Sequence, residues 1–152
     1  MKKLVKIYLR EKTILDALFD DGFVKRYDVL DLSKTYPQLK QLANRSLFLK
    51  GKILGTSGVK WNDELDIDAQ TIYSDGKTIK IKENIESVLL GFNLKMERLK
   101  NKLSQEEVSK ITGIEQADIS KIENGCANPT FNTIVKLVNC YSKTISFTMK
   151  NI

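Results

Sequence analysis

Apolar residues in the first half of the chain fall into short runs of the β type, separated by turn residues. Residues 3–9 are rich in β-branched and aromatic side chains and predict a strand. Two apolar runs within residues 13–29 flank the tripeptide Asp-Asp-Gly at 20–22. Glycine accepts the positive φ of a tight turn, so we expect a β-hairpin here. Residues 47–61 indicate two more short strands, broken by two glycines.

The same half contains two short helical patterns. Ser33 to Asn44 predicts a short helix, with Pro37 in its first turns and its leucines facing inward. Asp68 precedes the segment AQTIY and is expected to cap a single helical turn. Together with the strands, these patterns predict a small α+β domain.

Apolar residues take the helical spacing in the second half of the chain. Helices are expected over 87–101, 104–112, 115–124 and 130–140. The run TISFTMK at 144–150 places Ile145, Phe147 and Met149 on one face and predicts a strand. A single strand is not stable alone, so this one must join the first domain's sheet or pair with a second copy of the chain.

We therefore expect an α+β protein with two domains. The α+β domain covers residues 1–78, and 79–86 form a linker. Residues 87–143 form an all-α domain, and residues 144–152 form a β-strand tail.

Composition narrows the class of protein. The chain is 41% hydrophobic and 29% charged, which is typical of globular proteins. No apolar run approaches the ~20 residues that a membrane helix needs. The amino terminus has no apolar block of the kind found in secretory signals. We expect a cytoplasmic protein that does not bind a membrane.

The reactive side chains argue against an enzyme. Histidine, the commonest general base and metal ligand, is absent. Cys126 and Cys140 are too few for a disulfide framework and lack zinc-site spacing, so reduced thiols are expected. The four acids between Asp63 and Asp68 lack the pattern of a calcium loop, and turn formation and capping explain them better. Trp61 beside them should anchor a core. We expect no catalytic site, metal or cofactor.

The net charge of +6 suits a polyanionic partner. Its distribution is uneven, because residues 1–82 hold 16 Lys and Arg against 11 Asp and Glu, whereas residues 83–152 hold 9 against 8. The second half is nearly neutral. A nucleic-acid function for it must therefore rest on its sequence pattern.

That pattern begins with a helix start. Ser104 and Glu107 have the spacing of a capping box, in which each side chain bonds the backbone N–H of the other residue. Val108 and Ile111 then share one helix face. Gly113 follows, at a position where the chain must turn sharply and a side chain would collide.

A second amphipathic helix comes next, with Ile119 and Ile122 on its inner face. Its other face carries Gln116, Ala117, Ser120, Lys121 and Asn124. The sequence Asn-Gly at 124–125 ends it, since glycine suits a left-handed cap. Two such helices joined by a glycine turn also occur in ordinary helical hairpins.

The joint spacing is more specific. It resembles the phage-repressor/Cro family of helix-turn-helix proteins, whose members read like LSQEELA, then Gly followed by Ile or Val, IS-x-[IL]-E-x-G and NP-[ST]. This chain has LSQEEVSKITGIEQADISKIENGCANPT. Ser109 replaces the usual alanine but is also small. Glu115 stands where Ser or Thr normally caps the recognition helix, which weakens the cap by ~1 kcal/mol. Asp118 adds a second acid that repels phosphate.

The resemblance implies that the helix expected at 115–124 enters the DNA major groove with its amino end first. In that geometry Gln116 can pair with adenine, and Lys121 can donate to guanine or to a phosphate. Ala117 can contact a thymine methyl. Gln105 resembles the family glutamine that grips a phosphate and braces the first recognition residue.

The resemblance also separates architecture from recognition. Arg98 and Glu123 match the family's internal ion pair between helices and are expected to be structural. Ser120 and Asn124 belong to the DNA-facing side. Three lysines remain for contacts to the DNA backbone or for solvent: Lys95, Lys100 and Lys102.

The function implied is that of a transcriptional repressor that binds a palindromic double-stranded DNA operator as a homodimer. The alternative is an antitoxin, in which the first domain or the tail masks a toxin partner while the helix-turn-helix represses the shared operon. The first half, with GFVKRYDV and VKWNDELDIDAQTIY, resembles a small bacterial α+β domain family of unknown function. That resemblance implies no catalytic residues.

Overall fold

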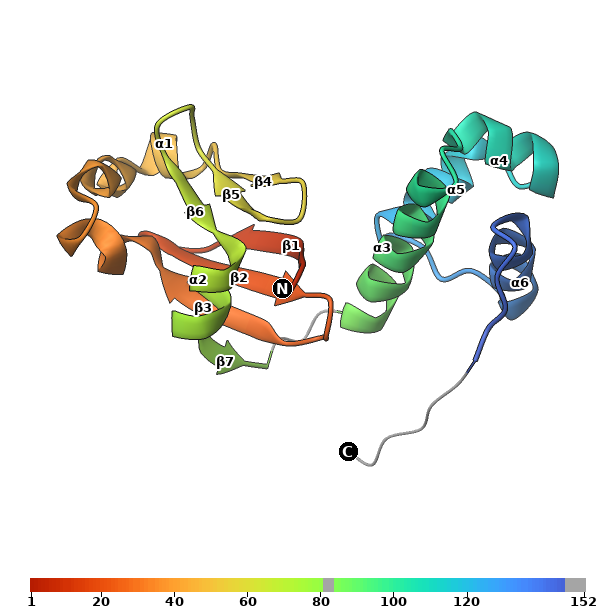
Figure 1. The fold of residues 1–152 in the computed structure, drawn as a ribbon, viewed down its shortest axis with the longest axis horizontal. Helices are drawn as coiled ribbons and strands as arrows, with labels where there is room; N and C mark the ends of the chain where they lie inside the picture. Colours follow the sequence, from red (N-terminus) through yellow and green to blue (C-terminus); the bar gives the residue numbers. More distant parts are fainter. Residues whose placement is uncertain (81–83, 147–152) are drawn as a thin grey trace. The chain divides into compact units, whose positions relative to one another are not determined.

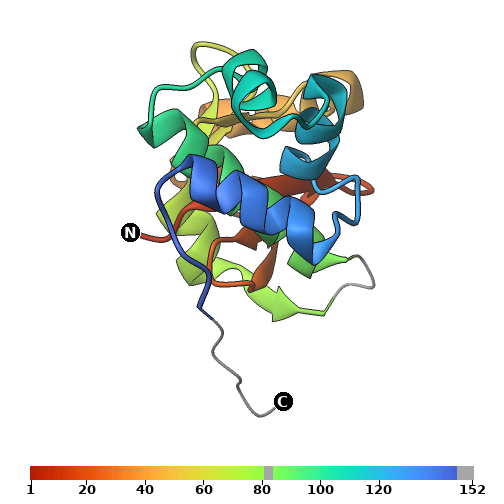
Figure 2. The same ribbon diagram turned by 90° about the vertical axis from the view of Figure 1, so that its right-hand side faces the viewer.

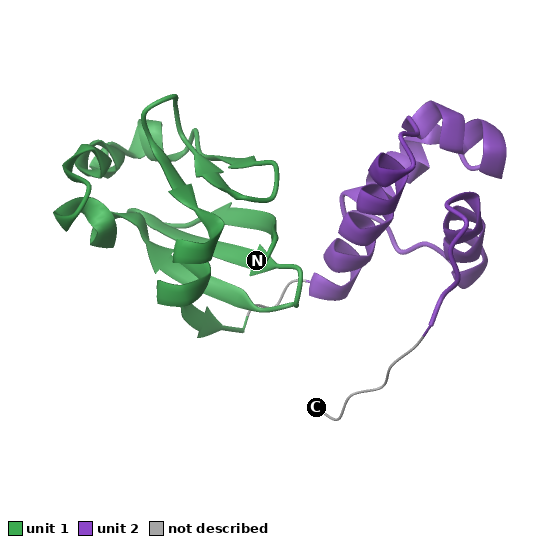
Figure 3. Ribbon diagram, viewed as in Figure 1, with its two compact units in different colours: residues 1–83 green, residues 84–152 purple. Residues whose placement is uncertain are grey.

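The computed structural model describes residues 1–80 and 84–146. The chain divides into two compact units, residues 1–83 and 84–152 (Figure 3). Unit 1 combines strands with short helices and unit 2 is helical in its described part, so the expected α+β class is confirmed (Figure 1). The boundary between the units falls inside the stretch 79–86. Within the described residues, no helix is long and apolar enough to span a bilayer.

Two antiparallel sheets form unit 1. The first has the strand order β1-β2-β3-β7, and its strands are β1 Leu4–Leu9, β2 Ile14–Phe19, β3 Val24–Asp28 and β7 Lys77–Ile79. The second has the order β4-β5-β6, with β4 Lys52–Leu54, β5 Gly58–Lys60 and β6 Asp66–Asp68. The predicted hairpin is confirmed, because β2 pairs with β3 across a turn in which Gly22 has φ 87°. β6 and β7 were not predicted.

β2, one of the two inner strands of the first sheet, contributes to the core of unit 1. Leu15, Ala17 and Phe19 are fully buried there. Trp61 is also buried, and its indole N–H donates to the Phe48 carbonyl at 2.8 Å. That bond satisfies the polar atom of a buried ring, and the predicted role of Trp61 as a core anchor is confirmed.

The helical segments of unit 1 are short. They are the 3₁₀ helices η1 Val29–Lys34 and η2 Pro37–Ala43 and the α-helices α1 Arg45–Phe48 and α2 Ala69–Asp75. The single helix predicted from Ser33 to Asn44 is wrong. Pro37 has no N–H and disfavours helical backbone at the residue before it, so the chain breaks ahead of it and restarts.

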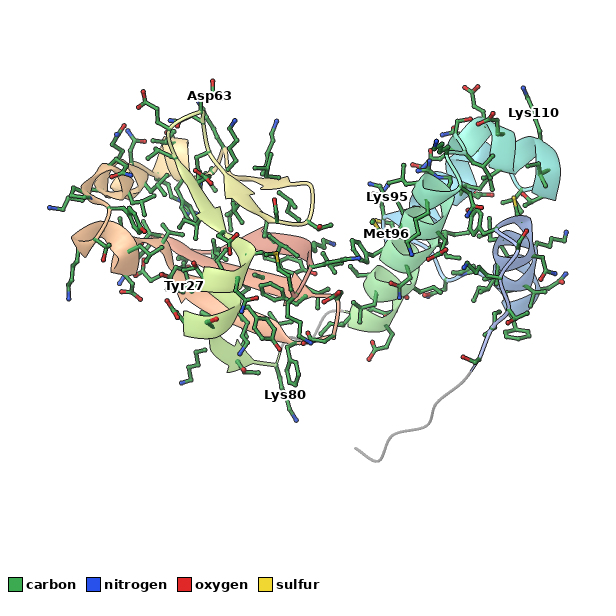
Figure 4. All side chains as sticks on the ribbon, viewed as in Figure 1. Tyr27, Asp63, Lys80, Lys95, Met96 and Lys110 are labelled. Carbon is green, nitrogen blue, oxygen red and sulfur yellow. The ribbon has the colours of Figure 1, made fainter. Side chains whose placement is uncertain are left out.

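Two of the acids in the stretch 63–68 make structural contacts. The Asp68 carboxylate accepts from the Gln70 N–H at 2.6 Å and caps α2, as predicted. Asp63 lies at an exposed loop tip and pairs with Lys60 at 2.8 Å (Figure 4).

Unit 2 contains four helices in its described part. They are α3 Ile85–Lys100, α4 Gln105–Thr112, α5 Gln116–Glu123 and α6 Phe131–Cys140, close to the predicted bounds. α5 packs against α3 and α4, and α6 packs against α4 (Figures 1 and 2). The core consists of Leu94, Val108, Ile119, Ile122, Leu137 and Tyr141. Val108 is fully buried, whereas Ile111, three residues further along α4, is 62% exposed.

Two glycines shape unit 2. Gly113 ends α4 with φ 73°, but a Cβ there would meet open space, so its backbone conformation and not the predicted collision favours glycine. Gly91 was not singled out from the sequence. A Cβ at Gly91 would lie 2.2 Å from the Ile122 carbonyl oxygen, so glycine allows α3 and α5 to pack closely.

The predicted tail strand is only partly covered by the structure. Residues 144–146 are described and have no strand conformation. Phe147 and Met149 lie outside the described residues.

Candidate nucleic-acid interface

The capping box at the start of α4 forms as predicted. The Ser104 hydroxyl accepts from the Glu107 N–H at 3.1 Å, and the Ser104 N–H donates to the Glu107 carboxylate at 2.7 Å. The bond from the Ser104 backbone keeps the pKa of the Glu107 carboxyl below its ordinary value. This cap makes Gln105 the first residue of α4.

α5 begins without such a cap. Glu115 occupies the cap position and its side chain makes no capping hydrogen bond, as the departure from the family pattern predicted. At the other end, the Asn124 side-chain amide donates to the Ser120 carbonyl at 2.8 Å. Gly125 follows in the left-handed conformation with φ 68°. The helix is therefore held mainly by its packing and by its carboxyl end.

The two faces of α5 differ in burial. Ile119, Ile122 and Glu123 are buried. Four of the residues expected to face DNA are exposed: Gln116, Ala117, Lys121 and Asn124. The fifth, Ser120, is half-buried. The outer face thus presents amide, methyl, hydroxyl and ammonium groups, which are suited to reading base edges.

A buried ion pair joins α3 to α5. Arg98 Nε donates to Glu123 Oε1 at 2.6 Å, and Arg98 Nη2 donates to Glu123 Oε2 at 2.9 Å. Arg98 Nη1 also donates to the Leu103 carbonyl at 2.8 Å. The hydrogen bond to Glu123 raises the pKa of the Arg98 guanidinium above its ordinary value. This bidentate geometry is the strong form of an arginine–carboxylate contact.

The hydrogen bonds continue from this pair to the surface. Gln105 Nε2 donates to Glu123 Oε2 at 2.8 Å. Gln116 Nε2 in turn donates to Gln105 Oε1 at 2.7 Å. The buried ion pair is therefore connected through one glutamine to the first residue of α5.

Comparisons with known proteins agree with this geometry in the second unit. The sequence model of the helix-turn-helix family matches residues 94–147. Unit 2 contains a helix-turn-helix domain. Its two characteristic helices are α4 and α5, joined at Gly113.

Other comparisons add little. One solved structure that aligns with this chain is the crystal structure of a "Putative DNA Binding Protein" from Nitrosomonas europaea ATCC 19718. The two chains are 18% identical in sequence, and the TM-score is 0.43. The alignment covers 99% of this chain and 97% of that chain. No curated protein matches the sequence.

The lysines of the helix-turn-helix domain are in different electrostatic environments. Lys100 Nζ lies 2.5 Å from Glu97 Oε1, so a neighbouring carboxylate compensates its charge. Lys121 Nζ lies 3.1 Å from Asp118 Oδ1. Lys95 is exposed on α3 (Figure 4). Lys100 is thus less available to a phosphate than its position in the sequence suggested.

Two further contacts of the domain were not predicted from the sequence. Asp118 was noted only as an acid, and its pairing with Lys121 depends on their three-residue spacing along α5. The Ser87 hydroxyl donates to Asn128 Oδ1 at 3.2 Å and ties the loop after α5 to α3. The spacing of Asp118 and Lys121 was a usable signal, whereas nothing local marked the contact between Ser87 and Asn128.

Proposed function

We propose that this protein is a DNA-binding transcriptional regulator that represses from a palindromic operator as a homodimer. The observation that carries the proposal is the outer face of α5, whose first side chain, Gln116, is held by Gln105 and the buried ion pair behind it. A solvated helix face needs no such support. A side chain that must meet a base edge in one orientation gains from it, because less conformational entropy is lost on binding.

The hydrogen-bonding capacity of Gln116 fits adenine. Its side-chain amide has two N–H donors and one carbonyl acceptor. One N–H is used by Gln105. The remaining N–H and the carbonyl are the donor and acceptor needed for adenine N7 and N6 in the major groove. The brace therefore leaves the base-reading atoms available.

The other roles follow from docking α5 in the major groove. Ala117 contacts a thymine methyl, and Lys121 donates to guanine. Ser120 and Asn124 lie toward the groove wall and the backbone. Gln105, at the amino end of α4, contacts a phosphate, where the helix dipole favours an anion.

DNA binding is tested by titrating the full chain into duplexes selected from a randomised pool, followed by fluorescence anisotropy. Affinity should fall steeply with salt, because each neutralised phosphate releases counterions. Gln116→Ala should weaken binding to the selected duplex, whereas the control Gln41→Ala, an exposed glutamine in unit 1, should not. A salt-independent affinity, or no binding to any duplex, would overturn the proposal.

The dimer is tested with the same duplexes. One helix-turn-helix covers a half-site, and two half-sites bound by a two-fold dimer lie about 34 Å apart, one turn of DNA. Inserting about half a turn between them should rotate one half-site to the far side and abolish cooperative binding. Full-length protein that stays monomeric by light scattering at high micromolar concentration would contradict the dimer.

A further inference from the structure

The recognition helix carries an ion pair that its fold does not need. Asp118 Oδ1 and Lys121 Nζ are 3.1 Å apart, and their side chains are 57% and 61% exposed. Such an exposed pair adds little to stability. Lys121 is the only cationic residue of α5, and Asp118 is its only exposed acid. The pair therefore dominates the charge that α5 presents outward.

We propose that Asp118 and Lys121 act together to read one G·C base pair in the major groove. Lys121 donates to guanine O6 and N7, and Asp118 accepts from the cytosine N4 amino group. This inference rests on the proposed function, because it needs α5 to lie in the groove.

The spacing of the two charged atoms supports this reading. In a G·C pair, guanine O6 and cytosine N4 are hydrogen-bonded to each other, with heavy atoms about 2.9 Å apart. The edge of the pair thus presents an acceptor next to a donor. Lys121 and Asp118 present a donor next to an acceptor at 3.1 Å. The two edges are complementary without separating the ion pair.

The same pair discriminates against the other base pairs. A T·A pair, with thymine in the place of guanine, also presents an acceptor beside a donor, but the thymine methyl lies next to O4, where the ammonium would have to sit. Adenine N7, an acceptor, would then face the Asp118 carboxylate. In a C·G or an A·T pair, an amino-group donor faces the Lys121 ammonium and a carbonyl acceptor faces the Asp118 carboxylate, so neither pair fits. Only one orientation of one base pair satisfies both side chains.

The Asp118 carboxylate increases the sequence selectivity of DNA binding and not its affinity. Near the phosphates it opposes binding, and only a cytosine amino group compensates for its desolvation. Asp118 therefore acts mainly by penalising wrong sequences.

The test measures affinity of the full chain for the selected duplex and for three versions with the proposed G·C pair changed to C·G, A·T or T·A. Wild-type protein should prefer G·C by about tenfold or more. Asp118→Ala and Lys121→Ala should each reduce that preference, at the same base pair. The preference at the adenine read by Gln116 should persist in both variants.

Glu106→Ala is the matched control, because Glu106 is an exposed acid on α4 outside the pair. It should leave the G·C preference unchanged. If Asp118→Ala and Glu106→Ala raise affinity for all duplexes equally, Asp118 acts by general repulsion and the inference is overturned. It is also overturned if the Asp118 and Lys121 variants affect different base pairs. In both cases the proposed DNA binding stands, whereas a wild-type protein that binds no duplex overturns both.

Discussion

Each unit contains a buried carboxylate that is paired with arginine, but the arginines differ in their exposure to solvent. In unit 1, Asp16 on β2 accepts from Arg10 Nε at 2.8 Å and from Arg26 at 2.7 and 2.9 Å. The side chains of Arg10 and Arg26 remain 38% and 47% exposed. In unit 2, Glu123 faces Arg98, whose side chain is only 9% exposed.

The two ion pairs also differ in what the carboxylate connects. Arg26 lies on β3, so the Asp16 cluster joins β2 to β3 through guanidinium groups that stay partly solvated. The Glu123 cluster continues through Gln105 to Gln116 on the surface. The same chemistry therefore joins two strands in one unit and, in the other, holds Gln116, the side chain proposed to read DNA.

The largest effect is expected for Arg98→Ala. It leaves Glu123 buried without its cation, which costs ~3–5 kcal/mol for a buried pair. Unfolding should be followed in urea by two signals. Circular dichroism reports mainly on the helices of unit 2, and the fluorescence of Trp61, the only tryptophan, reports on unit 1. The urea concentration at the midpoint of unfolding should fall when it is measured by circular dichroism and stay unchanged when it is measured by Trp61 fluorescence. Equal shifts of both would contradict two separately stabilised units.

Asp16→Ala should have a smaller effect, on the other signal. The guanidinium groups of Arg10 and Arg26 are already partly exposed and can be hydrated, so we expect a loss of ~1–3 kcal/mol. The Trp61 midpoint should fall and the dichroism midpoint should change little. A loss larger than that of Arg98→Ala would reverse the order of the comparison.

Low pH should reduce the contribution of Asp16 to the stability of unit 1. Burial raises the pKa of its carboxyl, but hydrogen bonds from Arg26 and Arg10 outweigh burial and hold the pKa below its ordinary value. The unfolded carboxyl therefore takes up its proton at higher pH than the folded one, so this stability is present above about pH 4 and lost as pH falls through the folded pKa.

Asp16→Asn provides the comparison. Wild-type protein should exceed it in stability at neutral pH, and the difference should shrink on acidification below about pH 4. Trp61 fluorescence in urea at a series of pH values measures this. A difference that stays constant to low pH would show that the charge of Asp16 does not stabilise unit 1.

The smallest change in stability is expected at the surface end of the unit 2 network. Gln116→Ala should change the free energy of unfolding by less than about 0.5 kcal/mol. It should relax sequence preference by ~1–3 kcal/mol at one base pair. Gln105→Ala, which removes the brace, should weaken preference at that same pair. If Gln105→Ala changed a different pair, the brace would not act through Gln116.

What the sequence could predict was local. The capping box at Ser104 and Glu107 and the Asp-Asp-Gly turn depend on residues a few positions apart, and both were correct. The helix bounds of unit 2 were close for the same reason. Periodicity placed Val108 and Ile111 on one helix face, but two apolar positions do not define how much of that face is covered, and Ile111 is exposed.

What the sequence could not predict depends on distant segments. β7 is a strand because it pairs with β3, about fifty residues earlier in the chain. Thr78 and Ile79 are β-branched residues that favour strands, but three residues are too short a run to mark a strand by themselves. Gly91 matters only because α5 lies against it. The family resemblance implied the Arg98–Glu123 pair and the bracing of Gln116 by Gln105. The bond from Gln105 to Glu123, which makes the network continuous, was not predicted, because it depends on the packing of α3, α4 and α5.

The most direct test of the central claim is a map of backbone amide shifts in the full chain on adding a selected duplex. The outer face of α5, braced at Gln116, is the surface that should read DNA. The account predicts the largest changes at Gln105 and along Gln116–Asn124. Changes confined to unit 1, with α5 unaffected, would contradict it.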